Sequence, residues 1–310
     1  MNESVDPALR SSAINIAHLH TFRHVMQQGG YAAAARVTDL SVPSIWQHIH
    51  ALEKLYDVEL FHRVGRQVRP TAAANQLYEE VDSILVQLES TFERMSSEPS
   101  KQTIRLVTGV RMMIEDLAEP LAMFHEQHLN RLAIRQGNER RALEMLLADE
   151  ADLALTLEPG LHQGSSGIHY EPAYTVEFLA VCSKSHPYAK SRSNGLRELS
   201  KHPLVVTAAG THGRDALEQA FHREGLVANI HIETDNSAFT IACVASGFGV
   251  GILAGRQQGD MCRSLATRSL SKQLGKRKIV FMWRKGRLLT EPMLQLIEAI
   301  KQIETSGQLA

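Results

Sequence analysis

The scarcity of cysteine and the absence of a long apolar run restrict the classes of protein to which this chain can belong. The 310 residues include three cysteines, Cys182, Cys243 and Cys262, which are far apart and lack the Cys-x-x-Cys spacing of zinc or dithiol sites. We therefore expect a reducing cytoplasm as the compartment. No run approaches the roughly 20 apolar residues of a membrane-spanning helix. Residues 1–13 lack the apolar core of a signal peptide and are expected to form a flexible tail.

Charge of either sign is not in excess. The chain has 33 Lys and Arg against 34 Asp and Glu, a formal net charge of −1, so contact with nucleic acid would need a local basic patch. Hydrophobic residues make up 44% of the chain, which at this length is enough for the cores of two or three domains.

Three helices are predicted near the N-terminus. Apolar residues of 16–28 recur at spacings of three and four, and Gly29-Gly30 ends that helix. Residues 31–37 are rich in alanine, which lets another helix pack closely. Ser41 can cap the third helix, and Pro43 falls in its first turn, where the absent N–H costs nothing. The pattern indicates a helix-turn-helix; a small helical core without DNA binding is the alternative.

A basic hairpin and a long helix follow. Residues 58–71 contain two short β-prone runs around Gly65 with three arginines, which suits a wing that faces phosphates. Residues 72–95 have an apolar and an acidic face, which predicts an amphipathic helix that needs a partner. The polar segment 96–102 contains Pro99 and is expected to be a linker.

Strands and helices alternate beyond residue 103, which predicts two α/β lobes built on parallel sheet. The expected strands are 104–108, 132–136, 152–157, 177–183, 204–207, 230–233, 249–253 and 278–283. The expected helices are 114–127, 140–148, 213–224, 237–246 and 292–303. The sequence GFGVG at 247–251 lacks the order of a nucleotide-binding fingerprint and is expected to permit close backbone packing.

Residues 32–74, AAAARVTDLSVPSIWQHIHALEKLYDVELFHRVGRQVRPTAAA, resemble the N-terminal module of LysR-type transcriptional regulators. The resemblance is carried by Ala34-Ala35, Ser41-x-Pro43, Ile49-x-Ala51-Leu52-Glu53, Leu60-Phe61-x-Arg63 and Thr71-x-Ala73. It covers nearly the whole chain, because TIRLVTGVRMMIEDLAEPLAMFHEQH, EADLALTLE and SAFTIACVASGFGVGIL fall where the family has its effector-binding domain. Segments such as QGNERRALEMLLADEADLALTLE look like the CysB-like branch.

The resemblance implies an α/β protein in three parts after the tail. They are an all-α winged helix-turn-helix with a β-wing (14–73), a linker and dimerisation helix with a hinge (74–101), and a two-lobed effector domain similar to periplasmic binding proteins (102–310). Lobe I would comprise about 102–173 and 275–305, and lobe II about 174–274. The implied partners are double-stranded DNA, a small-molecule effector, RNA polymerase, and a second or further copies of the chain through the helix 72–95.

The resemblance places residues 42–56 in the major groove and the wing along the DNA backbone. Gln47 can contact adenine, and Val42 a thymine methyl; Trp46 fits either base contact or the core. The family more often has Gln at 42, Ser at 46 and Arg or Lys at 47, so the operator sequence does not follow from the resemblance. Protonated His48, His50 and His62 would strengthen DNA binding. The expected DNA-binding residues are Ser41, Val42, Pro43, Ser44, Trp46, Gln47, His48, His50, Arg63, Arg66 and Arg69.

The resemblance also implies a ligand cleft between the lobes, at strand ends and helix starts. Arg111 and backbone N–H groups favour an organic anion with an apolar part near Val110 or Met112. Sulfate is not expected, because the hydroxyl residues of the CysB-like branch are missing after Thr108. An ion-pair role for Arg111 stays open. The expected effector-binding residues are Thr108, Gly109, Arg111, Gly137, Asn138, Thr207, Thr211, His212, Asn236 and Ser237.

The alternative function is an enzyme or solute-binding protein that uses the α/β lobes with an accessory helix-turn-helix. It predicts a catalytic set, but the sequence has no Ser-His-Asp motif, Walker sequence or zinc pattern, so we expect no catalysis, metal or cofactor. Three histidines without metal-ligand spacing, His18, His20 and His24, are expected on a helix surface. Cys182 and Cys243 lie in apolar runs and are expected to be buried.

Overall fold

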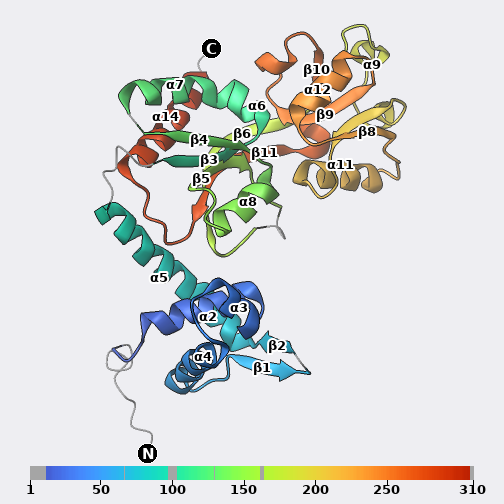
Figure 1. Cartoon of the computed structure of the whole chain (residues 1–310). Coiled ribbons are helices and arrows are strands. Elements are labelled where there is room, and N and C mark those ends of the chain that lie inside the picture. Colours follow the sequence, from blue (N-terminus) through green and yellow to red (C-terminus); the bar gives the residue numbers. More distant parts are fainter. Residues whose placement is uncertain (1–11, 66, 97–102, 129, 161–163, 308–310) are drawn as a thin grey trace, which may run out of the picture. The chain divides into compact units, whose positions relative to one another are not determined.

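The computed structural model describes residues 12–65, 67–96, 103–128, 130–160 and 164–307 (Figure 1). The chain splits into two compact units, Met1–Met95 with Lys285–Leu288 and Ser96–Arg284 with Leu289–Ala310. Residues 1–11 of the expected tail, 97–102 of the expected linker, and Arg66 lie outside the described residues.

The N-terminal unit is built from helices and one hairpin, in the order α2 (Ile16–Gln28), α3 (Tyr31–Val37), α4 (Val42–Tyr56), β1 (Phe61–Val64), β2 (Gln67–Pro70) and α5 (Ala72–Ser96). Local sequence sets the helix ends. The Ser41 hydroxyl accepts the N–H of Ser44 and caps α4, while Gly29 ends α2 in the left-handed conformation at φ 75°. The three expected helices and the wing are confirmed.

One core holds this unit together. Phe22, Ile45, Ile49, Leu52 and Leu60 are each at most 1% exposed, and they pack with Val81 and Leu85 of α5. The Glu53 carboxylate accepts the N–H of Leu60 at 2.9 Å and of Phe61 at 3.3 Å. Because these bonds join the end of α4 to the start of the hairpin, Glu53 fixes the wing on the third helix.

The second unit contains one mixed sheet of nine strands among the described residues. Its strands are β3 (Ile104–Thr108), β4 (Leu132–Gln136), β5 (Leu153–Leu157), β6 (Ile168–Cys182), β7 (Leu204–Thr207), β8 (Ile230–Thr234), β9 (Val250–Gly255), β10 (Ala266–Ser269) and β11 (Lys276–Arg284). The order is β4-β3-β5-β11-β6-β9-β7-β8, with β10 on β6.

The expectation of parallel sheet is correct for only part of this unit. Strands β3, β4 and β5 pair in parallel, as do β7, β8 and β9. In contrast, β11 pairs antiparallel with β5 and β6, and β6 pairs antiparallel with β9 and β10. The sequence predicted only the end of β6 as a strand, although β6 is 15 residues long and belongs to both halves of the sheet.

Two apolar cores meet along β6. Tyr174 and Val176 pack in the first core with Leu106, Phe281 and other residues. Further along the strand, Phe178 and Ala180 pack in the second core with Leu204 and Phe221. A 15-residue strand spans about 50 Å at 3.3 Å per residue, which is enough to serve two lobes.

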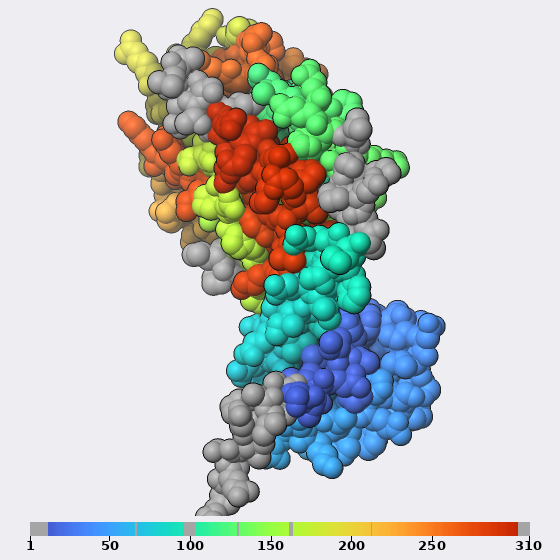
Figure 2. Space-filling view, turned by 90° about the vertical axis from the view of Figure 1, so that its left-hand side faces the viewer, coloured from blue at the N-terminus to red at the C-terminus, as the bar shows by residue number. Residues whose placement is uncertain are grey.

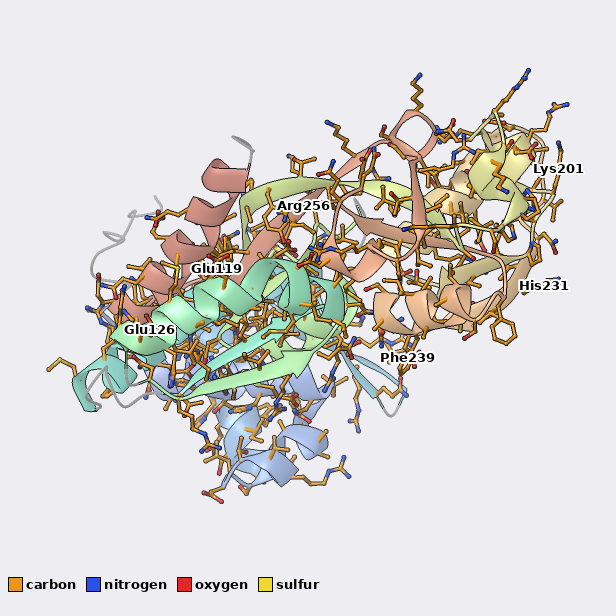
Figure 3. The ribbon with its side chains drawn as sticks, turned by 90° about the horizontal axis from the view of Figure 1, so that it is seen from above. Glu119, Glu126, Lys201, His231, Phe239 and Arg256 are labelled. Carbon is orange, nitrogen blue, oxygen red and sulfur yellow. The ribbon has the colours of Figure 1, made fainter. Side chains whose placement is uncertain are left out.

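Helices cover the sheet. They are α6 (Val110–Met112), a π-helix (Met113–Leu117), α7 (Ala118–Gln127), α8 (Glu139–Leu147), α9 (Pro187–Lys190), α10 (Leu196–Leu199), α11 (His212–Arg223), α12 (Ser237–Ala245), a 3-10 turn (Asp260–Cys262), α13 (Ser271–Leu274) and α14 (Glu291–Gly307). Figure 2 shows α14 beside α7 on one face, and exposed Glu119 and Glu126 mark the outer face of α7 in Figure 3.

The structure corrects the expected start of one helix. Helical structure after β3 begins at Val110 rather than near Ile114, and it passes through the π-helix before α7. The short elements α9, α10, α13 and β10 were not predicted, because a helix of four residues is barely one turn and β10 (Ala-Thr-Arg-Ser) has no apolar run.

Glycines at 249 and 251 allow the close packing expected of GFGVG. A Cβ on Gly249, whose φ is +133°, would lie 2.2 Å from the Pro203 carbonyl oxygen. A Cβ on Gly251 would come within 2.7 Å of Val244. Both positions therefore require glycine.

The cysteine environments differ. Cys182 is buried as expected, but Cys243 is only half-buried, which corrects that prediction, because α12 turns Thr240 and Val244 to the core and leaves Cys243 at its flank. Burial raises the pKa of the Cys262 thiol to about 11, and the Glu115 charge adds to this shift. None of the helices in the described part of the chain combines the length and the hydropathy that a membrane-spanning segment needs.

Candidate functional site

The first part of the candidate site is the exposed start of α4. Val42 is 43% exposed and Trp46 53% exposed, while Pro43 and Gln47 are also exposed. Trp46 stacks on His50 with ring centroids 4.9 Å apart, so the core position left open for Trp46 is excluded. Between the Ser41 cap and His50 the helix therefore presents an apolar and aromatic surface with one amide, Gln47.

His48 does not belong to this open surface. Its Nδ1 lies 2.8 Å from the Thr21 hydroxyl, and its ring packs on His18 at 4.4 Å. The half-buried imidazole is thus held against α2. This arrangement ties α4 to α2 and argues against the expected role of His48 in reading bases.

The wing presents its arginines on different faces. In the antiparallel register Arg63 pairs with Val68, and His62 pairs with Arg69. Side chains of paired residues share a face and successive residues alternate, so Arg63 and Arg69 point to opposite sides of the hairpin. The expectation that these arginines face phosphates stays a prediction, which would place the contacts of Arg63 and Arg69 on different sides of the hairpin, and Arg66 lies outside the described residues.

The histidines of α2 are half-buried rather than free on the helix surface. Burial lowers the pKa of His18, His20 and His24 below the ordinary 6.5, and the neighbouring His48 adds to the shift at His18. The His18 ring packs on His48 of α4, and His20 Nδ1 lies 3.7 Å from Glu89 of α5, contacts between helices that the sequence could not place together.

We predict that acidification through pH 6.5 weakens the N-terminal unit. The unfolded chain binds histidine protons at higher pH than the folded chain, so unfolding takes up protons and its free energy falls as the pH drops. Amide hydrogen exchange of α2, corrected for its intrinsic rate, should therefore show less protection at pH 5.5 than at pH 7.5. His18→Gln should flatten this dependence; equal protection at both pH values would contradict it.

The second part of the candidate site is a cavity in the α/β unit. It has a volume of about 120 Å³. An apolar cavity of roughly 150 Å³ holds one benzene, so this space suits a small organic molecule. Its apolar wall includes Met112, Phe178 and Leu217.

The structure places most of the expected effector residues at this cavity. Those that line it are Gly109, Arg111, Gly137, Asn138, Thr207, Thr211, Asn236 and Ser237. Thr108 does not: it is buried, and its hydroxyl donates to the Leu155 carbonyl within the sheet. The side chain of His212, the remaining expected residue, lies outside the part of the chain that the structure describes.

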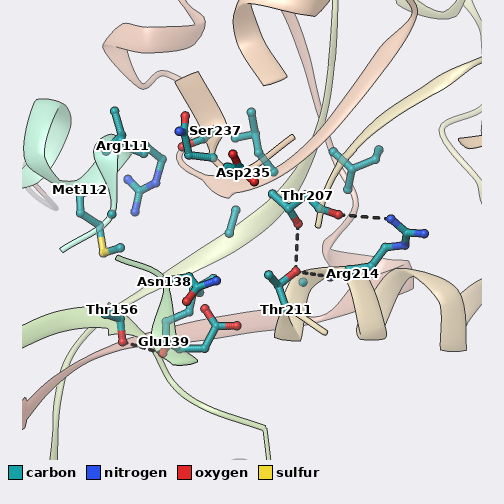
Figure 4. Close-up of a pocket in the computed structure, with 18 of the residues that line it drawn as sticks. Arg111, Met112, Asn138, Glu139, Thr156, Thr207, Thr211, Arg214, Asp235 and Ser237 are labelled. Carbon is teal, nitrogen blue, oxygen red and sulfur yellow. Dashed lines mark hydrogen bonds between the residues drawn. The ribbon is translucent and has the colours of Figure 1, made fainter. Parts of the chain in front are cut away.

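Three capped helix starts face the cavity. Asn138 caps α8 by accepting the N–H of Arg141, Thr211 caps α11 through the N–H of Arg214, and Asn236 caps α12 through the N–H groups of Ala238 and Phe239. All three capping residues line the cavity; Asn138 and Thr211 are labelled in Figure 4. Helix N-termini carry partial positive charge and unpaired N–H groups, so they attract the negative part of a ligand.

Arg111 lines the cavity but forms buried ion pairs. Its side chain is 6% exposed and lies 3.1 Å from Glu115 and 3.0 Å from Asp116. Burial would lower the Arg111 pKa, but the Asp116 and Glu115 charges outweigh it and hold the pKa above its ordinary value. The ion-pair role left open for Arg111 is the one that the structure shows.

The Arg111 cluster joins elements of both halves of the sheet. Asp116 also accepts the Tyr174 hydroxyl and pairs with Arg256 at 2.9 Å. Glu115 accepts the backbone N–H of Met261 at 3.0 Å. Burial and the Asp116 charge raise the Tyr174 pKa above its ordinary range, so the phenol remains a proton donor.

Sequence reasoning missed several residues of the cavity. Glu139 and Asp235 directly adjoin the expected Asn138 and Asn236, so helix-start positions could have included them. Phe178 gave no signal, because only the tertiary path of β6 brings it to the cavity. Among the described residues, no three or more His, Cys, Asp and Glu side chains gather to hold a metal ion.

A winged helix-turn-helix and an α/β unit with a ligand-sized cavity define a ligand-responsive DNA-binding protein. The bacterial regulatory helix-turn-helix of the lysR family matches residues 16–75, and the LysR substrate binding domain matches residues 97–303. The chain belongs to the LysR family of transcriptional regulators.

Similar proteins include the regulator CysB of Haemophilus influenzae, 27% identical over 246 residues, which cover 76% of this chain and 75% of that protein. The transcriptional activator LysR of Escherichia coli is 25% identical over 250 residues, 78% of each chain. The crystal structure of HinK from Pseudomonas aeruginosa has a TM-score of 0.56 at 21% identity and covers 96% of this chain and 99% of that one.

Proposed function

We propose that this regulator reads its operator with the exposed start of α4 and responds to a small organic effector in the α/β cavity. The observation that carries the DNA part is the capped, solvent-facing surface of Val42, Trp46 and Gln47. Gln47 can make two hydrogen bonds to adenine, and the apolar groups suit thymine methyls. Ser44 is half-buried at the cap and contacts the Ser41 hydroxyl at 2.8 Å.

The proposed assembly is a homodimer or homotetramer that pairs through α5. Ile84 is 58% exposed, Phe92 68% and Met95 89%, whereas Val81 and Leu85 face the core of the same unit. With the half-buried Leu88, these residues follow a spacing of four, four and three along the helix. Such a stripe is typical of a helix that packs on a second helix.

The proposed response is a shift between assembly states. An effector that binds one arrangement of the α/β unit more tightly than another changes the populations of the two arrangements. This change alters the orientation of the DNA-binding modules. RNA polymerase is a further proposed partner. We place this activity in the cytoplasm, where DNA lies, and propose no catalysis, because the chain belongs to a family of transcriptional regulators.

The test is selection of genomic DNA fragments by the full-length protein, followed by footprinting of the recovered sites. We expect protection of a partly two-fold symmetric site, since two modules of a dimer read two half-sites. Absence of sequence-specific protection would overturn the proposal. Phe92→Glu tests the assembly, because it should shift the protein towards monomer in sedimentation. The control is Glu126→Ala, at an exposed position of α7, which should leave the assembly unchanged.

A further inference from the structure

A bidentate ion pair joins the first helix of the helix-turn-helix to the long helix α5. The Arg23 guanidinium of α2 donates from Nη1 to Glu89 Oε2 at 3.2 Å and from Nη2 to Glu89 Oε1 at 2.5 Å. Arg23 is only 9% exposed, and its neighbour Phe22 belongs to the core of the same unit. A planar contact of this kind fixes direction as well as distance, whereas apolar packing is not directional.

The pair lies beyond the apolar contact between α5 and the rest of the N-terminal unit. Val81 and Leu85 of α5 pack in the core, and Glu89 follows Leu85 by four residues on the same face of the helix. Gln27 of α2 donates from Nε2 to the Tyr78 hydroxyl of α5 at 3.3 Å. Positions 78 and 89 are about 16 Å apart along the helix at 1.5 Å per residue. Polar contacts therefore hold α2 against α5 at two separate points.

The adjoining face of α5 is the one proposed to pair with a second copy of the chain. That face contains the exposed Ile84, Phe92 and Met95 and the half-buried Leu88. Leu88 and Glu89 are consecutive, and consecutive residues of an α-helix are about 100° apart around its axis. Figure 1 shows that α5 continues past α2, α3 and α4. One side of α5 thus holds its own DNA-binding module, and the adjoining side is available to a partner.

Resting on the proposed function, we propose that the Arg23–Glu89 pair sets the spacing between the two half-sites of the operator. Helix α4 packs on α2, and packed helices lie about 8–10 Å apart, so α4 is up to about 20 Å from the axis of α5. A tilt of about 10° between α2 and α5 would move α4 by roughly 3.5 Å, close to the rise of one base pair. The pair touches no base. It is a positioning contact that selects the distance at which both modules of a dimer fit the DNA.

The neighbouring histidines leave this pair intact at neutral pH. Nδ1 of His20 lies 3.4 Å from Arg23 Nη2 and 3.7 Å from Glu89 Oε1. Burial and the Arg23 charge lower the pKa of His20 below 6.5, and the same causes lower the pKa of His24. At pH 7.5 both rings are therefore neutral and do not compete with Arg23 for the Glu89 carboxylate.

Affinities for operators that differ only in half-site spacing test the proposal. The half-sites found by footprinting are placed at spacings that change in single base-pair steps, and fluorescence anisotropy of the full-length protein is measured at pH 7.5. The unaltered protein should bind its best spacing about tenfold or more tightly than spacings one base pair longer or shorter.

Arg23→Met should reduce this ratio to about threefold or less, because it keeps the apolar stem but removes the directional contact. The Glu89 side chain is 41% exposed, so the substitution leaves no buried carboxylate without water. The base preference within each half-site should not change. Arg23→Lys keeps the charge and loses the two parallel hydrogen bonds, so it should give an intermediate ratio.

Arg36→Met is the control, because Arg36 is an exposed arginine in the last turn of α3 in the same unit. Loss of a phosphate contact weakens binding to all spacings alike, so this variant should keep the ratio of the unaltered protein. A purely structural role of Arg23 would also lower all affinities in parallel. The ratio between spacings therefore separates positioning from stability.

Two results would overturn the proposal: the unaltered protein binds neighbouring spacings equally well, or the Arg23 variants keep its ratio. Arg23→Lys supplies the decisive comparison where Arg23→Met does not fold. Footprinting of the unaltered protein separates this failure from failure of the proposed function. A protected two-fold site whose spacing preference does not depend on Arg23 rejects only the role of the pair, whereas absence of specific protection rejects the regulator mechanism itself.

Discussion

Asp116→Ala is expected to lower the free energy of unfolding of the α/β unit by about 3 kcal/mol, the lower end of the range for breaking a buried ion pair. The Asp116 carboxylate is 3% exposed and holds Arg111, Arg256 and the Tyr174 hydroxyl. Its removal leaves the charge of Arg111, whose side chain is 6% exposed, to pair with Glu115. Urea unfolding measures the effect.

The protein offers a selective reporter for that measurement. Its two tryptophans are Trp46, in the N-terminal unit, and Trp283, on β11. In a Trp46→Phe background, fluorescence therefore follows the α/β unit alone. Asp260→Ala is the matched control: Asp260 also pairs with an arginine, Arg263, but their side chains are 65% and 81% exposed. An exposed pair contributes at most about 1 kcal/mol. Equal effects of both substitutions would contradict the structural role of Asp116.

Gln47→Ala is expected to weaken operator binding by about 30-fold or more. A bidentate contact between an amide side chain and adenine contributes roughly 1–3 kcal/mol of discrimination, and a dimer makes it at both half-sites. Fluorescence anisotropy on the footprinted site gives the affinity, and repeated selection gives the altered base preference. Gln28→Ala is the control, since Gln28 is an exposed glutamine at the end of α2 in the same unit.

Arg69→Ala provides the contrast that assigns Gln47 to base reading. Arg69 is exposed on the wing, so its loss should weaken binding to all sequences alike and reduce the salt dependence by about one phosphate contact per chain. Gln47→Ala should instead relax the preference at one position of each half-site. A Gln47→Ala protein that keeps both its affinity and its preference would remove Gln47 from the DNA interface.

The N-terminal helices could be predicted because their signals are local. The Ser41 hydroxyl caps the helix that begins at Val42 by accepting the N–H of Ser44, three residues on, and Gly29 ends α2 where the sequence places it. The same holds for the strands Ile104–Thr108, Leu132–Gln136 and Leu204–Thr207, whose short apolar runs are flanked by polar residues. These features depend on neighbours a few residues away, which the sequence shows directly.

Residues whose role depends on distant partners could not be assigned in this way. Asn138, Thr211 and Asn236 could be found as cavity residues, because each is also a local helix cap. Phe178 could not, since only the path of β6 brings it there. The sequence likewise gave no sign that His48 turns to Thr21, 27 residues away, rather than to DNA.

The sequence by itself determined the family, the three-helix module with its wing, and the helix starts where a ligand's negative group can bind. Only the tertiary structure decided the balance of charge: Arg111 lies among carboxylates, Glu139 lines the cavity, and Arg63 and Arg69 point to opposite sides of the wing. The physical reason is that secondary structure follows from adjacent residues. The charge and exposure of a side chain depend instead on groups that folding brings together from far along the chain.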